Sequence, residues 1–166
     1  MIGGLSFGRS KIKAVKAKRV RNLLGRDFGK QRTSDKLTIE KRSSLMAKIR
    51  SRDSRLEQQF VASLRNITHK SFQTNVSSIK GRPDIVFQES KVCVFLDSDF
   101  WHGWYYPRWK HLLKNNFWRD KIENNRKRDR KTTIYLRRNG WIVLRFWEHD
   151  IKNCVEESAQ RVDLVS

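Results

Sequence analysis

Continuous apolar runs separated by polar turns predict two neighbouring β-strands in the middle of the chain. Residues 85–87 (Ile-Val-Phe) and 92–96 (Val-Cys-Val-Phe-Leu) are short apolar runs rich in β-branched and aromatic side chains, which is typical of buried strands. The polar residues 88–90 between them predict a turn. Residues 141–147 form a third run of the same kind, and residues 72–77 are a weaker candidate strand.

Apolar positions at helical spacing predict helices before, between and after these strands. In residues 38–66, apolar side chains recur every three to four positions. Residues 117–138 are the clearest helix, because an apolar stripe follows one face and Gly140 supplies the usual C-terminal stop. A last amphipathic helix extends to about Leu164.

The order of elements is therefore helix, strands, helix, strand, helix. A helix that crosses between two strands of one sheet implies an α/β sandwich with a mixed sheet. In open α/β folds the functional sites lie where strands end. The polar residues at the strand ends are accordingly the first candidates for chemistry.

The charge of the chain points to a polyanionic partner. The 166 residues carry a formal net charge of +20, which favours nucleic acid as the partner. Six tryptophans indicate a packed core or aromatic wedges rather than a structural RNA-binding protein. No run approaches the roughly 18 apolar residues of a membrane span, so we expect no membrane partner.

Residues 1–37 differ from the rest of the chain. Eleven Lys or Arg side chains and only two acidic ones lie between Arg9 and Lys36. We predict a basic N-terminal arm over residues 1–37, flexible or in contact with DNA, and one domain over residues 38–166. A solvated tail without a specific role is the alternative for the arm. We expect a cytoplasmic, bacterial or phage-type protein, while the acid-poor residues 1–26 leave an organellar transit peptide open.

Two aspartates at the predicted strand ends form a candidate metal site. Asp84 follows Pro83 and opens the first strand, and Asp97 closes the second. Carboxylates that point at one place suit Mg²⁺, which takes few protein ligands and keeps waters for phosphate. His102, in the following loop, is a candidate base, because histidine titrates near neutral pH. Taken singly these residues would fit a turn and a strand end, but their order and closeness favour a site.

The segment after the second strand mixes aromatic and basic side chains. Residues 98–116 combine them in a way that suits base stacking and phosphate contact. On the next helix, Asn125 and Asp129 interrupt the apolar stripe and must be satisfied if they are buried. They form either a core hydrogen-bond network or a support for the catalytic loop. The basic residues outside that stripe are candidate phosphate contacts: Arg126, Lys127 and Arg130.

Glu57 has two interpretations. Ser54-Arg55-Leu56-Glu57 has the form of a capping box at the start of a helix. The start of that helix can equally bring the Glu57 carboxylate to the site. Both interpretations can hold, although not with the same oxygens.

Together these segments resemble the very-short-patch-repair (Vsr-type) DNA mismatch endonucleases, a divergent branch of the PD-(D/E)xK nucleases. The resemblance covers roughly residues 38–152. The matching segments are Arg42 to Asp53, Glu57, Gly81 to Asp84, Val94 to Asp97, Phe100 to His102, Phe117-Trp118, Lys121-Ile122, Asn125, Arg128-Asp129 and Gly140 to His149. The resemblance implies a three-layer restriction-endonuclease-like fold, with a central mixed sheet flanked by helices. It also implies Mg²⁺-dependent cleavage of double-stranded DNA by a monomer.

By position, the resemblance implies a role for each candidate residue. Asp84 corresponds to the metal-binding aspartate, the backbone carbonyl of Leu96 to a second ligand, and Glu57 to a carboxylate that holds metal-bound water. His102 corresponds to the residue that activates water, and Asp97 to a residue beside the scissile phosphate. The residues that wedge into the base stack correspond to Met46, Phe100 and Trp101. Unstacking costs a few kcal/mol per step, and a mismatch lowers that cost.

The aromatic loop departs from the family pattern. Family members often hold a structural zinc there, whereas this chain has Asp99, Trp104, Tyr106 and His149 at the corresponding positions. We therefore expect Mg²⁺ but no structural zinc. Two alternatives to mismatch repair stay open. One is a homing or mobile-element endonuclease with a Vsr-like core that cuts a matched site, and the other is a non-catalytic nucleic-acid-binding protein.

Overall fold

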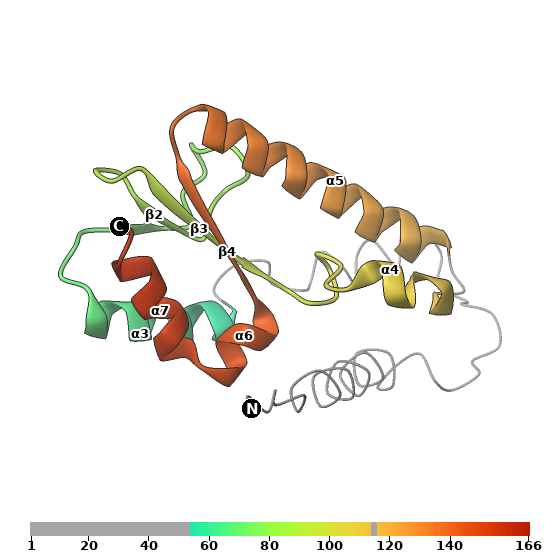
Figure 1. The fold of residues 1–166 in the computed structure, drawn as a ribbon, viewed down its shortest axis with the longest axis horizontal. Helices are drawn as coiled ribbons and strands as arrows, with labels where there is room; N and C mark the ends of the chain where they lie inside the picture. Colours follow the sequence, from blue (N-terminus) through green and yellow to red (C-terminus); the bar gives the residue numbers. More distant parts are fainter. Residues whose placement is uncertain (1–53, 114–115) are drawn as a thin grey trace, which may run out of the picture. The chain divides into compact units, whose positions relative to one another are not determined.

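A four-stranded mixed sheet lies at the centre of the protein (Figure 1). The computed structural model describes residues 54–113 and 116–166, all within one compact unit. The strands follow the order β1-β2-β3-β4, with β1 Gln73–Thr74, β2 Ile85–Phe87, β3 Val92–Asp97 and β4 Ile142–Trp147. Neighbours among the first three strands are antiparallel, and β4 is parallel to β3. The predicted mixed sheet is confirmed.

Helices precede the sheet, cross between β3 and β4, and follow β4. They are α3 Arg55–Ile67, α4 Tyr106–Trp109, the 3-10 turn Lys110–Leu112, α5 Asn116–Arg138, α6 Glu148–Asn153 and α7 Val155–Asp163. The helix predicted over residues 117–138 is confirmed as α5. The single C-terminal helix that we predicted is instead two helices, because the extended backbone of Cys154 separates α6 from α7.

The helix predicted over residues 38–66 is described only in part. Its C-terminal half is α3, and its N-terminal half lies outside the described residues, as does the predicted boundary between residues 37 and 38. In the part of the chain that the structure describes, no helix has the length and apolar character needed to cross a membrane.

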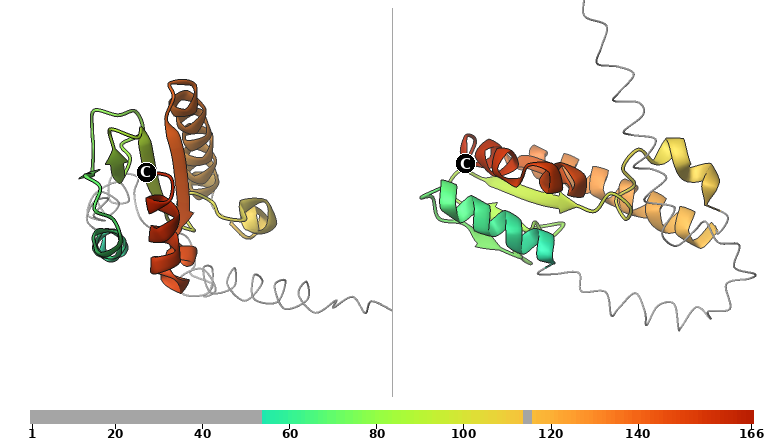
Figure 2. Two further views of the ribbon diagram at one scale, coloured as in Figure 1. Left: turned by 60° about the vertical axis from the view of Figure 1, so that its left-hand side comes forward. Right: turned by 90° about the horizontal axis from the view of Figure 1, so that it is seen from below.

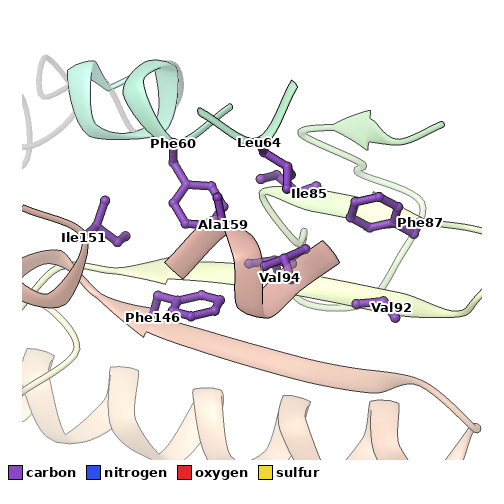
Figure 3. Close-up of a cluster of buried hydrophobic side chains, with 10 residues drawn as sticks. Phe60, Leu64, Ile85, Phe87, Val92, Val94, Phe146, Ile151 and Ala159 are labelled. Atoms are coloured by element: carbon purple, nitrogen blue, oxygen red, sulfur yellow. The ribbon is translucent and has the colours of Figure 1, made fainter. Parts of the chain in front are cut away.

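Both faces of the sheet are covered by helices (Figures 1 and 2). Alternate residues of β3 point to opposite faces. Val92 and Val94 join the core beneath α3, α6 and α7 (Figure 3), whereas Cys93 and Phe95 pack with Leu136 of α5. A strand buried on both faces reads as a continuous apolar run, which explains why β3 shows no polar alternation.

Gly81 brings the turn before β2 into close contact with α5. Its backbone has a φ of 90°, which disfavours residues with a side chain. A Cβ added there would lie 2.3 Å from Cγ2 of Thr132. The Gly81-Arg82-Pro83 turn therefore packs directly on the helix, and Asp84 follows from a backbone that is held in place.

Candidate active site

Asp84 and Asp97 reach the same end of the sheet. Ile85 pairs with Val94 in the antiparallel register of β2 and β3, so the start of β2 lies beside the end of β3. The N–H of Asp84 donates to the Val94 carbonyl at 3.0 Å, and the N–H of Leu96 donates to Oδ2 of Asp84 at 2.7 Å. Backbone hydrogen bonds to β3 thus fix both the main chain and the carboxylate of Asp84.

Burial raises the pKa of Asp84 to about 6, and the hydrogen bond from the Leu96 N–H only partly opposes this. The neighbouring carboxylates of Glu57 and Asp97 contribute to this rise, whereas His102 acts to lower the pKa. Neighbouring negative charges that raise the pKa of Asp84 in this way form a site that favours a cation.

Glu57, Asp84 and Leu96 line one cleft between α3 and the sheet. Carboxylate and carbonyl oxygens are ligands that suit Mg²⁺, which needs one or two carboxylates and keeps several waters. Within residues 54–113 and 116–166, no group of three or more His, Cys, Asp or Glu side chains is arranged to hold a metal. The residues that line the cleft carry oxygen ligands of the kind that a hydrated Mg²⁺ takes.

The structure shows the predicted N-cap and places Glu57 beside the candidate metal site. Oγ of Ser54 accepts a hydrogen bond from the backbone N–H of Glu57 at 3.2 Å, so Ser54 is the N-cap of α3 as predicted. This cap uses the backbone of Glu57, while the residue also lines the cleft with Asp84.

His102 lies between two carboxylates that come from different elements. Its Nδ1 is 2.7 Å from Oδ2 of Asp129 on α5 and 3.2 Å from Oδ1 of Asp97 at the end of β3. Because Nδ1 faces carboxylates, it carries the ring proton, and Nε2 is the nitrogen that can accept another. A histidine oriented in this way is a typical general base. Although burial opposes it, the hydrogen bond from His102 holds the pKa of Asp129 below its usual value.

Asn125 and Asp129 both support the loop that carries His102. Nδ2 of Asn125 donates to the carbonyl of Trp101 at 2.9 Å, next to the hydrogen bond between His102 and Asp129. Gly103 allows this loop to approach α5, because a Cβ added there would lie 2.9 Å from Cγ2 of Ile122. The two polar residues in the apolar stripe therefore bind the loop rather than one another.

Arg145 belongs to the site but was missed in the sequence. It lies opposite Phe95 in the parallel register of β3 and β4, and two of its nitrogens donate to the Asp97 carboxylate, each at 2.6 Å. A third nitrogen donates to Oγ1 of Thr133 at 3.4 Å, and the guanidinium lies 4.7 Å from the centre of the Phe95 ring. The available signal was a charged residue inside an apolar strand, between Leu144 and Phe146.

Asp97 is consequently held differently from Asp84. Both of its oxygens bind Arg145, and its side chain is buried. We predicted that both aspartates would point at one metal ion. The structure brings both to the site, but only Asp84 lines the cleft with Glu57, while Asp97 orients His102 and Arg145.

The predicted wedge residues stand on an aromatic base. Phe100 stacks on the buried Trp109, with ring centres 5.8 Å apart, and Trp101 packs on Trp118 at 5.5 Å. Both Phe100 and Trp101 are half-buried. Met46 lies outside the described residues.

Asp99, Trp104 and His149, which stand where family members often bind zinc, lie in contact with one another. Nδ1 of His149 lies 2.6 Å from Oδ1 of Asp99, both residues are buried, and the Trp104 ring packs on His149 at 4.6 Å. The Glu148 carboxylate also accepts a hydrogen bond from the Asp99 N–H at 3.3 Å. Hydrogen bonds and ring contacts thus attach the aromatic loop to α6.

The basic residues predicted on α5 are exposed, and they line two clefts. Arg126 and Arg130 line a cleft that also includes His102, Asp129 and Arg145. They line a second cleft as well, together with Lys127, Tyr106 and Lys110.

Known proteins match most of this chain. Residues 34–108 match the family described as DNA mismatch endonuclease Vsr. The chain is 38% identical over 134 residues to type II nicking enzyme V.NmeDIP of Neisseria meningitidis serogroup C, which covers 77% of this chain and 90% of that protein. For type II nicking enzyme V.HpaIIP of Haemophilus parainfluenzae the identity is 36% over 119 residues, with 70% and 84% covered. For DNA mismatch endonuclease Vsr of Escherichia coli (strain K12) it is 36% over 108 residues, with 64% and 69% covered.

Proposed function

Because this chain is a DNA endonuclease of the Vsr family, we propose that it uses Mg²⁺ to nick one strand of double-stranded DNA beside a mismatched base pair. The observation that carries this proposal is the position of His102, which lies next to Asp97 at the end of β3 and close to Asp84 at the start of β2. Nδ1 of His102 is held by Asp129 and Asp97, and the charge of Asp84 is close enough to interact with the ring. Metal-dependent hydrolysis of a phosphodiester needs a general base for water and a cation beside the phosphate, and this site offers an oriented base next to residues that can bind a cation.

Asp84 and the Leu96 carbonyl would hold the Mg²⁺ ion, with Glu57 binding it through water. When bound, Mg²⁺ would neutralise charge on the scissile phosphate and lower the pKa of the attacking water. The donor set supports this assignment, because all three residues line one cleft and each of them carries an oxygen of the kind that Mg²⁺ prefers.

In the proposed reaction, Nε2 of His102 accepts a proton from water as the water oxygen attacks phosphorus. The P–O3′ bond breaks, the 3′ oxygen takes a proton from solvent, and the products carry a 5′-phosphate and a 3′-hydroxyl. Asp129 and Asp97 stabilise the imidazolium that forms, and they keep the ring from turning.

The arrangement of helices supports the three-layer restriction-endonuclease-like architecture. α5 packs on one face of the sheet, and α3, α6 and α7 pack on the other. We further propose that the enzyme acts as a monomer and that the basic residues 1–37 add phosphate contacts.

Phe100 and Trp101 would provide selectivity for a mismatch. Both rings are half-buried and rest on other aromatic side chains, so they can enter a base stack without losing their support. Inserting a wedge costs a few kcal/mol per unstacked step, and a mismatched pair has already lost part of that stacking.

Cleavage of matched and mismatched duplexes tests this function. With Mg²⁺, we expect nicking of a T:G duplex to be at least about tenfold faster than nicking of the T:A duplex, since each 1.4 kcal/mol of saved unstacking gives a factor of ten. EDTA should abolish both reactions. Double-strand cleavage of the matched duplex would indicate a homing-type enzyme, and tight binding without any cleavage would contradict the enzymatic proposal.

Gly103→Ala is expected to slow DNA cleavage by about a hundredfold, because displacements near 1 Å in a catalytic group can cost that much. The backbone of Gly103 has a φ of 70°, and an added Cβ would lie 2.9 Å from Cγ2 of Ile122, which is fully buried and cannot move aside. The loop must therefore move away from α5, and His102 moves with it. Initial rates of nicking under saturating DNA measure the effect.

Gly140→Ala is the matched control for this variant. Gly140 has a φ of 80°, but no atom lies within 4 Å of its added Cβ. The control therefore carries the backbone strain of about 1–3 kcal/mol without the collision. Equal loss of cleavage in both variants would show that the contact between loop and helix is unimportant.

A further inference from the structure

A cleft on the α5 side of His102 is lined by residues that the proposed reaction does not use. Its walls include Arg126, Arg130 and Arg137 of α5, and Trp147 of β4. His102 lines the same cleft, so the cleft is continuous with the site at which the phosphate would react.

The charge of this cleft is positive and available to a ligand. Its two acidic residues, Asp97 and Asp129, are already engaged by Arg145 and His102. Among the described residues, neither Arg130 nor Arg137 has an ion-pair partner, and both are exposed. Exposed guanidinium groups without a carboxylate partner attract phosphate, which they bind with two parallel hydrogen bonds.

The three arginines lie on one stripe of the helix. Positions 126, 130 and 137 are separated by four and seven residues, which brings them to nearly the same face. At 1.5 Å per residue the stripe is about 16 Å long. Each strand of duplex DNA carries one phosphate per about 3.4 Å of the helix axis, and the backbone distance between phosphates is longer than this rise, so the stripe is long enough to meet at least two of them. Ile134 and Trp147 add apolar surface that a deoxyribose can contact.

The cleft beside α3 is less suited to the backbone of a DNA strand. Its charged lining residues are Glu57, Asp84 and Arg65, so carboxylates outnumber the single arginine, and they would repel phosphates other than the one held through the metal. A strand whose scissile phosphate lies at His102 must continue away from that residue. The cleft lined by arginines begins at His102, and its positive charge attracts the phosphates of that strand.

We propose that this cleft binds the backbone of the cut strand on one side of the scissile bond, with Arg130 and Arg137 each contacting one phosphate. The proposal rests on the proposed nuclease function, because the scissile phosphate is what brings that strand to His102. It assigns Arg137, Ile134 and Trp147 to substrate binding, and it fixes which strand they contact.

Binding of modified duplexes tests this assignment. Each phosphate within four positions of the mismatch, on either strand, is replaced in turn by a neutral methylphosphonate, and affinity is measured in EDTA with wild-type protein, Arg130→Ala and Arg137→Ala. Each variant should bind the unmodified duplex several-fold more weakly, and the slope of log K against log salt should fall by about 0.9, as expected for one lost phosphate contact. Each should also become insensitive to neutralisation of one phosphate of the cut strand, because the partner of that phosphate has been removed.

Arg138→Ala is the control, since Arg138 is the next exposed arginine of α5 and lies outside the lining of the cleft. The proposal would be overturned if Arg130→Ala and Arg137→Ala lost no more affinity than the control. It would also be overturned if their affinity depended on phosphates of the uncut strand. Binding in EDTA needs no catalysis, so the two proposals fail separately. Nicking without coupling contradicts the cleft alone. Coupling to the phosphates of one strand without any nicking contradicts the nuclease function, and it leaves only the phosphate contacts of Arg130 and Arg137.

Discussion

Asp84→Asn is expected to lower DNA cleavage by more than about a hundredfold while DNA binding is retained. Even the hydrogen-bond partners of metal ligands are typically worth 10- to 100-fold, and Asp84 is itself the proposed ligand. Asparagine keeps the shape of the side chain and an oxygen that can accept from the Leu96 N–H, so the fold should be intact. Nicking rates with Mg²⁺, together with affinity in EDTA, measure the two effects.

The same substitution is expected to stabilise the metal-free protein at neutral pH. The pKa of Asp84 is raised from 3.8 to about 6, so the folded chain holds this proton more tightly than the unfolded chain. Wild-type stability therefore falls as the pH rises from about 4 to 6, whereas the variant has no such loss. Above pH 6 the difference reaches about 3 kcal/mol at most, because each pKa unit corresponds to about 1.4 kcal/mol.

Chemical denaturation in EDTA at pH 4 and pH 7.5 measures this difference. Asp120→Asn is the control, because Asp120 is exposed on α5. Adding Mg²⁺ should raise the melting temperature of wild type but not of Asp84→Asn. An Asp84→Asn protein that still responds to Mg²⁺ and still nicks DNA would remove Asp84 from the metal site.

Arg145→Met is expected to cost about 3–5 kcal/mol of folding stability, since removing one partner of a buried ion pair leaves an uncompensated charge. Asp97 would lose both of its 2.6 Å hydrogen bonds while it stays buried. Cleavage should fall as well, because Asp97 and Asp129 would no longer be held around His102. The stability and the cleavage rate of Arg145→Lys should lie between those of the wild type and Arg145→Met, because lysine keeps the charge but cannot form the paired hydrogen bonds.

A double variant separates stability from positioning. Asp97→Leu combined with Arg145→Met removes both charges, so most of the lost stability should return. Cleavage should stay low, because one of the two carboxylates that orient His102 is absent. Arg138→Met, an exposed arginine of α5, should change stability by less than about 0.5 kcal/mol. Full activity in the double variant would mean that Asp97 and Arg145 serve the fold alone.

Local patterns were sufficient to predict the elements that carry the candidate site. β2, β3 and α5 lie where their apolar patterns indicated, because each is buried along a regular face. Asn125 and Asp129 were recognisable as exceptions within a helical stripe, since an apolar environment makes a polar side chain conspicuous. β1 is shorter than predicted, because only Gln73 and Thr74 pair with β2 and both are exposed.

Pairings between distant residues were beyond the reach of those patterns. Asp97 and Arg145 are 48 residues apart, and no local spacing relates them. The contact between Asp99 and His149 has the same origin, since it depends on how the aromatic loop meets α6. The break at Cys154 also escaped prediction, because an amphipathic pattern continues across it and only the backbone shows the interruption.

The parallel pairing of β3 with β4 sets the order in which the site is assembled during folding. β2 and β3 form a local hairpin, a step that takes about 1–10 μs, and it brings Asp84 and Asp97 together. Parallel pairing requires the whole crossover through α5 and is intrinsically slower. On the ribosome, Arg145 is added about 2–10 s after Asp97 at typical rates of synthesis. Pulse-labelled hydrogen exchange would report this order as early protection of the hairpin. A nascent chain therefore carries Asp84, the proposed metal ligand, well before the carboxylates and Arg145 are arranged around His102, and we expect it to become competent to cut DNA only when its last third has folded.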